Sequence, residues 1–573
     1  MVIGMAVTAR WGRQTRSDTL GRLIERSGLR RAHRTVLLAA VTGLLTGLSV
    51  AAFEWLAGST LLARVERAPL AVQLVLPAAG LVAAALALRW LAAGATPSTA
   101  EEYVKSFHER ERRLDLKPVL GRVVACVATL GSGLAMGFEG PAIYMGAAIG
   151  SGLQRRLSRY FSRDDAKVLL VAGAAAGVAA IFKAPATGVV FALEVPYQED
   201  LARRMLLPAL FSAATGYIVY AAFFGTTPLF PITGSPPFGF VDLGGAALLG
   251  LACGVGARGF ARLIRQAKQL SGTAHPVLRI AGAGASIAGL VALGRLGTGE
   301  SLVLGSGYPA IAWALTPNHA LGIILALFVL RALATASAVA GGGAGGLFVP
   351  LVVQGALLGA AAASLFGLAD TPLFPVLGVA AFLGAGYRVP LAAVMFVAES
   401  TGRPGFIVPG IIAAASSQLV IGRASVSAYQ RGARTGILEQ RLTLPVTSVL
   451  RTDAATVPPD ATLQEVFSHH IVSVRLLVVP VVDGSRYLGM LHLHDLVAID
   501  QAQWSRQTVD QIMRTDEPVG DVDWTLGQTL TALEQADVDR LAITDRGAFI
   551  GVVTTGELLK LDEILENTTP PPP

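Results

Sequence analysis

The chain has few charged residues and very few cysteines. Asp, Glu, Lys and Arg make up only 15% of its 573 residues, whereas a soluble protein of this size carries about a quarter. Its mean hydropathy is +0.57, which argues against a soluble protein with one very large apolar core. The two cysteines, Cys126 and Cys253, both lie in apolar runs, so neither a disulfide nor a metal site is expected.

The apolar residues form long runs through the first three quarters of the chain. A helix needs about 20 such residues to cross the hydrocarbon core of a membrane. Some runs reach this length, and others are shorter or interrupted by glycine. We therefore predict an all-α membrane protein that crosses the bilayer many times, with some tilted, short or discontinuous helices. The long runs are Val36–Ala57, Pro69–Leu91, Leu243–Ala257 and Leu321–Ala340, and the short ones include Val168–Ile181 and Gly346–Ala363.

Charge is distributed unevenly along the chain. Residues 1–440 hold 37 basic and 20 acidic residues, while residues 441–573 hold 9 basic and 19 acidic ones. The first 34 residues contain eight arginines and no pattern of a secretory signal peptide, so the positive-inside rule predicts that they stay in the cytoplasm. The basic surplus of the apolar part favours anions over cations near a pore mouth.

Two linked motifs occur twice, in the same order. Pro141 and Pro350 are each followed, at the same spacing, by Gly-Ala and a further Gly. Pro185 and Pro390 each have a basic residue two positions earlier, and Phe and Glu six and nine positions later. The prolines lie 44 residues apart in the first copy and 40 in the second, which predicts a duplicated membrane unit. The matched residues are Lys183, Phe191 and Glu194, and Arg388, Phe396 and Glu399.

Each copy opens with a glycine-rich approach to a proline, "GFEGPA" in the first and "GGLFVPL" in the second. Proline suits the first turn of a helix, where the backbone N–H groups lack partners within the helix. Such a helix start carries about half a positive charge and can bind an anion without trapping it. Duplicated membrane halves commonly place such ends at one shared site. The alternative is that the glycines only permit close helix packing; the presence of the pattern in both copies favours an anion site.

Glu139 lies inside the first of these motifs. Its carboxylate is itself an anion, so it can occupy the place of a halide and close the path. Protonation, or displacement by an incoming ion, would move it away and would couple permeation to pH. The alternative is a carboxylate fixed by a salt bridge to a nearby arginine such as Arg122.

These segments resemble a known family. The stretches "GFEGP", "AAGVAAIFKAPATGVVFALEV", "GGLFVP" and "GAGYRVPLAAVMFVAES" are similar, in this order, to the motifs of the CLC family of chloride channels and chloride/proton antiporters. The likeness extends from about Val36 to Tyr429. It implies the CLC fold, with two inverted halves and one anion pore in each subunit, and a homodimer in the membrane.

The resemblance also implies roles for individual residues. Glu139 matches the family's gating glutamate. The backbone N–H groups of Phe138, Gly140, Leu347 and Phe348 match its anion-binding amides. The expected substrate is chloride or another small monovalent anion.

Two parts of the family pattern match less well. The stretch "GATPSTAEEY" stands where the family has its pore serine, and "ASVSAYQRG" stands where it has its pore tyrosine. In the most direct alignment the serine becomes Ala95, and the tyrosine becomes Val426 or Ser427. The alignment therefore does not assign the residues that supply hydroxyl groups to the central site. The candidates are Thr96, Ser98, Ser427 and Tyr429.

One further departure concerns proton transport. The family's antiporters carry an inward-facing glutamate immediately after the position matched by Glu194. Here that position is Val195, which cannot carry a proton, and the channel members look similar there. We therefore interpret the chain as an anion channel gated by Glu139, with chloride/proton exchange as the alternative.

The other charged residues of the repeat are expected to have structural roles. Glu194 and Glu399 lie at equivalent positions and should cap or pair within the helix bundle. Lys183 and Arg388 either raise the local positive potential or extend towards an interface.

From Arg441 onwards the composition becomes that of a soluble domain. Segments 441–506 and 507–566 each contain strands and helices in the same order and resemble a pair of CBS domains, which in CLC proteins are cytoplasmic and bind adenine nucleotides in some members. Asp495 and Glu557 match the position whose carboxylate holds ribose hydroxyls. The alternative, which we favour, is that they are ordinary charges at helix starts.

The expected organisation is therefore a helical membrane domain of the CLC fold with an α/β CBS pair. Its segments are a basic cytoplasmic segment 1–35, a membrane domain 36–440, CBS domains 441–506 and 507–566, and a disordered end 567–573.

Two other classes of function fit the sequence less well. A CBS-linked divalent-cation transporter should carry clustered carboxylates in its membrane part, whereas the acids here are isolated. A membrane enzyme should show a Ser/His/Asp, metal-binding or phosphate-loop pattern, and we find none. We expect no enzymatic activity, no bound metal and no nucleic-acid partner.

Overall fold

The chain divides into two compact units, Met1–Ala433 and Arg434–Pro573. The computed structural model describes residues 33–109, 114–158, 167–232, 238–368, 371–432, 442–471 and 477–557. Most of the predicted basic segment 1–35, and all of the predicted disordered end 567–573, lie outside these described residues. Each unit is considered by itself below.

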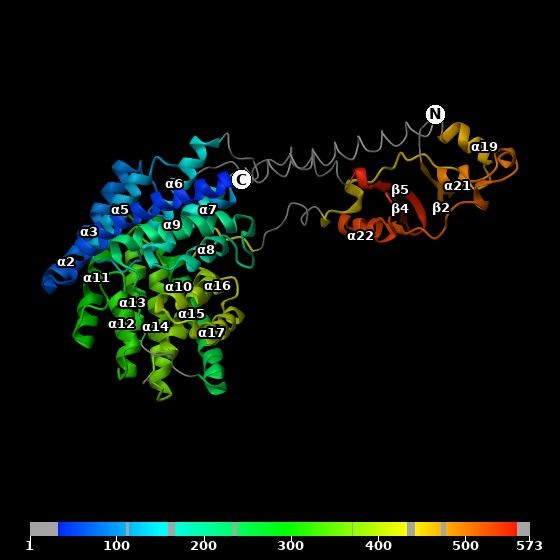
Figure 1. The fold of residues 1–573 in the computed structure, drawn as a ribbon. Helices are drawn as coiled ribbons and strands as arrows, with labels where there is room; N and C mark the ends of the chain where they lie inside the picture. Colours follow the sequence, from blue (N-terminus) through cyan, green and yellow to red (C-terminus); the bar gives the residue numbers. More distant parts are fainter. Residues whose placement is uncertain are drawn as a thin grey trace, which may run out of the picture. The chain divides into compact units, whose positions relative to one another are not determined.

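The first unit consists of helices (Figure 1). Eight of its described helices are long and apolar enough to cross a membrane. The predicted run Leu321–Ala340 is one complete helix, α13, and other helices are shorter, such as α8 (Pro185–Glu194). The prediction of many spans mixed with short helices is confirmed. The remaining helices are His33–Glu66, which ends in η1 (Trp55–Leu62) and α2 (Ala63–Glu66), α3 (Leu70–Leu91), α4 (Ala100–His108), α5 (Val119–Gly131), α6 (Glu139–Arg156), α7 (Val168–Phe182), η3 (Arg203–Met205), α9 (Leu206–Phe224), α10 (Phe240–Thr273), α11 (Pro276–Thr298), α12 (Tyr308–Leu315), α14 (Phe348–Leu365), α15 (Leu373–Tyr387), α16 (Pro390–Thr401), η4 (Pro404–Phe406) and α17 (Ile407–Ile421).

The predicted duplication is visible in the helix order. Helices α6 and α14 both have 18 residues, and α7 and α15 both have 15. In the first copy α6 packs on α7 and α7 on α9; in the second, α14 packs on α15 and α15 on α17. In Figure 1 the helices up to α9, in blue to blue-green, form one half of the unit, and those from α10, in green to yellow, form the other.

The repeated glycines allow the paired helices to approach closely. A Cβ atom on Gly146 would lie 2.0 Å from the carbonyl oxygen of Gly173, and one on Gly355 would lie 2.3 Å from that of Gly378. Both distances are far below van der Waals contact, so glycine is required at these positions. Close helix packing, proposed as the alternative to an anion site, therefore explains these particular glycines.

Two glutamates cap each other's helices. Glu194, at the end of α8, accepts a hydrogen bond from the N–H of Ala392 at the start of α16 (2.9 Å). Glu399, in α16, accepts bonds from the N–H (2.7 Å) and the hydroxyl (2.6 Å) of Thr187 at the start of α8. Each carboxylate thus neutralises the positive end of the other helix. The expected capping role is confirmed, and the exchange joins the two copies.

The repeated basic residues hold equivalent helix ends. Lys183 follows α7 and Arg388 follows α15, both in the left-handed conformation (φ 52° and 57°). Lys183 donates to the carbonyl of Phe224 at the end of α9 (2.8 Å), and Arg388 donates to the carbonyl of Gly422 after α17. Binding of helix-end carbonyls is a role that the sequence did not suggest.

The second unit contains a five-stranded sheet in the order β1-β2-β5-β4-β3. The pairs β1–β2 and β4–β5 are antiparallel, and β3–β4 is parallel. The opening strand of the first copy is reduced to one bridge, between Val457 and Val481. The predicted α/β pair is confirmed. Its elements are η5 (Val446–Ser448), α19 (Leu463–Val466), η6 (Phe467–Ile471), β1 (Val478–Asp483), β2 (Arg486–His492), α21 (Leu493–Val497), η7 (Gln501–Gln503), η8 (Val509–Gln511), β3 (Val519–Asp521), α22 (Leu526–Ala536), β4 (Arg540–Asp545) and β5 (Ala548–Thr554).

Within this unit Asp495 forms a bidentate ion pair with Arg514. The guanidinium donates to both carboxylate oxygens, at 2.6 and 2.7 Å. These hydrogen bonds lower the pKa of Asp495 below its ordinary value. The pair joins α21 to the segment that follows η8.

The first prediction concerns the exchanged caps. Glu399→Gln removes the charge that accepts three hydrogen bonds at the start of α8. Because hydrogen bonds to a charged group contribute about 1.5–3 kcal/mol, the variant should lose at least about 1.5 kcal/mol of stability. Thermal unfolding of the detergent-purified protein measures this loss, with Glu300→Gln at an exposed site as control. Equal stability of both variants and the wild type would contradict the capping role.

The second prediction concerns Asp495. Because its folded-state pKa is lowered, its stabilising effect is complete at neutral pH and is lost as the pH falls below about 4. Asp495→Asn should therefore destabilise the second unit slightly at pH 7 and less at pH 3. Urea unfolding of residues 434–573 at both pH values measures this, with the exposed Asp483→Asn as control. A loss that is the same at pH 3 would show that the ion pair is not its cause.

Candidate anion site

The starts of the two repeated helices meet in the interior of the membrane unit. Gly137, just before α6, and Gly346, just before α14, form an antiparallel pair with N–H···O distances of 2.9 and 2.8 Å. The pair brings together the backbone amides predicted to bind an anion. These residues, Phe138, Gly140, Leu347 and Phe348, are all buried.

The carboxylate of Glu139 fills the space between the two glycines. A Cβ atom on Gly137 would lie 1.9 Å from Oε2 of Glu139, and one on Gly346 would lie 1.9 Å from Oε1. Any other residue at either position would displace the carboxylate. The glycines before α6 and α14 therefore leave room for the carboxylate of Glu139, in addition to allowing the chain to turn into each helix.

Glu139 is held by a helix start, and no cation among the described residues pairs with it. Its side chain is fully buried, and Oε1 accepts a hydrogen bond from the N–H of Phe348 at 2.5 Å. Oε2 has no hydrogen-bond partner among the described residues. Arg122 pairs instead with Glu102 (3.4 Å) and donates to Tyr144 (3.0 Å). The salt-bridge alternative is therefore wrong, and the carboxylate lies where an anion would meet the amide of Phe348.

Aromatic rings surround this helix start. The ring of Phe348 lies 4.5 Å from Phe182, 4.9 Å from Phe396 and 5.4 Å from Phe191, measured between centroids. Phe191 and Phe396 are the equivalent phenylalanines of the two copies. Such rings exclude water, and in the resulting low dielectric the few polar groups act strongly on a charge.

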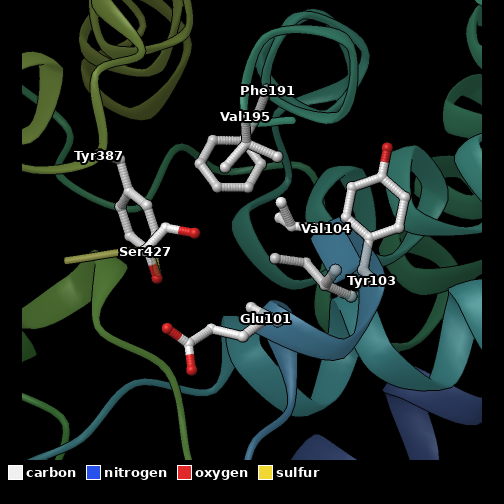
Figure 2. Close-up of a pocket in the computed structure, with 9 residues that line it drawn as sticks. Glu101, Tyr103, Val104, Phe191, Val195, Tyr387 and Ser427 are labelled. Atoms are coloured by element: carbon white, nitrogen blue, oxygen red, sulfur yellow. The ribbon is translucent and has the colours of Figure 1, made fainter. Parts of the chain in front are cut away.

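A small cavity lies beside the aromatic cluster (Figure 2). Its volume of about 10 Å³ is room for roughly one water molecule. Tyr387 and Ser427 line one wall in this view, and Val195 and Glu101 lie at different ends of it. The hydroxyl of Tyr103 points away and donates to the carbonyl of Ala192 (2.6 Å). The lining residues are Ala100, Glu101, Tyr103, Val104, Ile143, Phe191, Val195, Tyr387 and Ser427.

The four candidate hydroxyls lie in different places. Thr96 accepts a hydrogen bond from Arg122 at 3.3 Å, and Ser98 faces Glu101 at 3.5 Å. Tyr429 is 44% exposed and lies outside the cavity lining. Ser427 lines the cavity, and its buried Oγ has no partner among the described residues. The structure therefore brings only Ser427 of the four to the cavity.

Two hydroxyls near the site were missed in the sequence. Thr99 donates to the carbonyl of Gly345 (3.2 Å), and its oxygen lies 2.6 Å from where a Cβ on Gly140 would be. The ring of Tyr387 lies 6.5 Å from that of Phe348, measured between centroids. Each had a signal in the sequence. Thr99 and Glu102 form the T-x-x-E pattern of a helix start, and Tyr387 stands where the first copy has Phe182.

The candidate nucleotide carboxylates of the second unit already have protein partners. Asp495 pairs with Arg514, as described above. Glu557 lies 3.3 Å from Arg451 and accepts the N–H of Thr554 (3.1 Å). A bound nucleotide would share these carboxylates with their protein partners. Among the described residues no group of three or more His, Cys, Asp or Glu side chains could hold a metal ion.

Family models match most of the chain. Residues 79–422 match the model of the voltage gated chloride channel family. Residues 446–501 and 509–563 each match the CBS domain model.

Curated relatives match over the membrane unit. The H(+)/Cl(−) exchange transporter ClcA of Citrobacter koseri is 30% identical over 435 residues, which cover 71% of this chain and 89% of the relative. The protein of the same name from Salmonella paratyphi B is 29% identical over 433 residues, with the same coverage.

Solved structures share the fold. A slow cyanobacterial Cl−/H+ antiporter matches with a TM-score of 0.60 at 22% identity, covering 68% of this chain and 94% of that chain. A CLC-type fluoride/proton antiporter matches with a TM-score of 0.61 at 24% identity, covering 70% and 98%. A eukaryotic CLC transporter matches with a TM-score of 0.58 at 18% identity, covering 92% and 98%. With the family-model match and the converging helix starts, these findings establish that the chain is a multi-pass membrane protein of the CLC family of anion transporters, with two CBS domains at its C-terminal end.

Proposed function

We propose that the protein exchanges a small monovalent anion for protons, with Glu139 as both the gate and a proton carrier. Chloride is the anion named for the curated relatives, and we propose it for this chain. Proton exchange thus replaces the channel interpretation as the preferred one.

The observation that carries this proposal is the bonding of Glu139. A buried carboxylate without a cation is costly, yet here one oxygen takes the amide of Phe348 and the other has no described partner. The ionised carboxylate and a bound anion compete for the same N–H groups. A proton on Glu139 cancels this competition, because a neutral carboxyl group binds a helix start more weakly.

This competition supplies a mechanism for exchange. When Glu139 is ionised, its carboxylate occupies the amide at α14 and excludes the anion. When Glu139 is protonated, its side chain leaves, and the amides of Leu347 and Phe348 become available to the anion. Return of the carboxylate expels the anion after the proton has been released. Anion and proton movements are thereby linked through one side chain.

The relatives support exchange over passive conduction. The curated proteins are named exchange transporters, and two of the fold neighbours are described as antiporters. Val195 is the observation that favours a channel, because it removes the carboxylate expected on a proton route. A channel is therefore the second candidate.

Other features of the expected organisation remain proposals. We propose that the protein is a homodimer, as its resemblance to the family implies. The eight arginines of the first 34 residues support a cytoplasmic N-terminus, and the resemblance to the family implies cytoplasmic CBS domains. Regulation by an adenine nucleotide also remains a proposal, and calorimetry of residues 434–573 with millimolar ATP tests it directly.

The third prediction concerns coupling in the wild type. In chloride-loaded liposomes that hold the purified protein, an outward chloride gradient should drive proton uptake in a fixed ratio to chloride efflux. Simultaneous chloride and pH electrodes measure both fluxes. Chloride efflux with no proton movement would overturn exchange in favour of the channel.

The fourth prediction concerns Glu139→Gln. Glutamine keeps the shape of a protonated carboxyl group but cannot ionise. Chloride efflux should persist, proton uptake should fall to background, and the flux should lose the pH dependence that comes from titration of this carboxyl group. The control is Glu300→Gln, outside the site. Unchanged pH dependence in Glu139→Gln would contradict its role as the gate.

A further inference from the structure

Exchange requires a proton route to Glu139 from both sides of the membrane. This inference therefore rests on the proposed function. Val195 cannot take part in such a route, because valine has no ionisable group. The question is which other group of this chain can carry the proton on that side of the molecule.

Glu101 is the one acidic side chain among the residues that line the cavity beside Val195 (Figure 2). It lies in the first turn of α4, far from Val195 in sequence. The cavity has room for roughly one water molecule. The carboxylate missing at position 195 is therefore replaced, in the same cavity, by one from another helix.

The two oxygens of Glu101 are bonded differently. Oε1 lies 2.7 Å from Nζ of Lys268 and accepts the N–H of Ala428 at 3.1 Å. Oε2 has only a marginal contact, with the hydroxyl of Ser98 at 3.5 Å. The side chain is 22% exposed. One oxygen is thus anchored by a cation on α10, and the other is available to a proton from solution.

Two hydroxyl groups line the cavity together with Glu101. One belongs to Tyr387, whose ring lies 6.5 Å from that of Phe348, the residue whose N–H binds Glu139. The buried hydroxyl of Ser427 has no described partner, and it lines the same cavity. A hydroxyl can accept one proton and release another, so these groups and a cavity water can pass a proton without themselves becoming charged for long.

We propose that Glu101 is the proton acceptor that serves Glu139 from the Val195 side of the membrane. A proton from solution binds Oε2 of Glu101. It then moves onto the cavity water or the Tyr387 hydroxyl, which releases its own proton towards Oε2 of Glu139. Only O–H bonds form and break, and the sequence ends with Glu101 ionised and Glu139 neutral.

The same end of the membrane unit leads to the CBS domains. Tyr197, two residues after Val195, forms a bridge with Arg431, shortly before the end of the first unit. Glu101 therefore faces the side on which the chain leaves the membrane. If the CBS domains are cytoplasmic, Glu101 takes up protons from the cytoplasm.

The neighbouring acid provides a matched control. Glu102 follows Glu101 on α4, but it pairs with Arg122 and does not line the cavity. Lys268 provides a second control, because its replacement breaks the ion pair with Glu101 but keeps the carboxylate itself and its hydrogen bond from the N–H of Ala428.

The experiment measures chloride and proton fluxes together for wild type, Glu101→Gln, Glu102→Gln and Lys268→Met in chloride-loaded liposomes. We expect Glu101→Gln to lower proton flux at least about tenfold, since transfer by a positioned side chain contributes more than this. Its chloride flux, which also reports correct folding, should stay within about twofold. Glu102→Gln and Lys268→Met should keep the wild-type ratio of protons to chloride.

Three outcomes would count against the inference, and they can be told apart. Wild type without proton flux removes the proposed exchange and this inference with it. Coupled wild type together with coupled Glu101→Gln removes the inference alone. Uncoupling in Lys268→Met to the same extent as in Glu101→Gln would mean that the ion pair, and not proton uptake by Glu101, maintains coupling.

Discussion

The structure depends on one contact between the two copies, the backbone pairing of Gly137 with Gly346. It fixes the starts of α6 and α14 against each other, deep in the membrane unit. Helix starts there have N–H groups that lipid cannot satisfy, so they need an anion or an acidic side chain. Glu139 meets this need when no anion is present. The anion site thus follows from the need of these backbone N–H groups for a hydrogen-bond acceptor. Its positive potential comes from the helix starts.

The surrounding helices can reach this arrangement because small residues let them approach closely. The close pairs Gly146–Gly173 and Gly355–Gly378 pack α6 against α7 and α14 against α15 in the two halves. The exchanged caps of Glu194 and Glu399 then join the halves through α8 and α16. Three acidic residues in the membrane therefore bind helix starts. Glu194 and Glu399 each use both carboxylate oxygens to cap a helix start. Glu139 uses one oxygen, and the other has no described partner.

Local patterns in the sequence predicted the fold and the helix starts well. The run Leu321–Ala340 is α13, and the repeat around Pro141 and Pro350 marks α6 and α14. Contacts between distant segments could not be predicted in this way. Thr99 meets Gly345 across 246 positions, and no spacing rule connects them. The same holds for the candidate hydroxyls: Thr96 and Ser98 contact Arg122 and Glu101, whereas Thr99, which the alignment did not single out, lies beside Gly140.

A comparison by position at Val195 considers one residue of the cavity and leaves out the other residues that line it. The absence of a carboxylate at position 195 suggests the loss of proton transport only if the proton acceptor must stand at that position. A proton route is defined by what lines a cavity, and the cavity beside Val195 receives Glu101 from α4. The side chain of Glu101 is also placed by Lys268, which lies 167 residues further along the chain. The choice between channel and exchanger therefore depends on this cavity as a whole, with its one acid and its hydroxyls, and not on residue 195 alone.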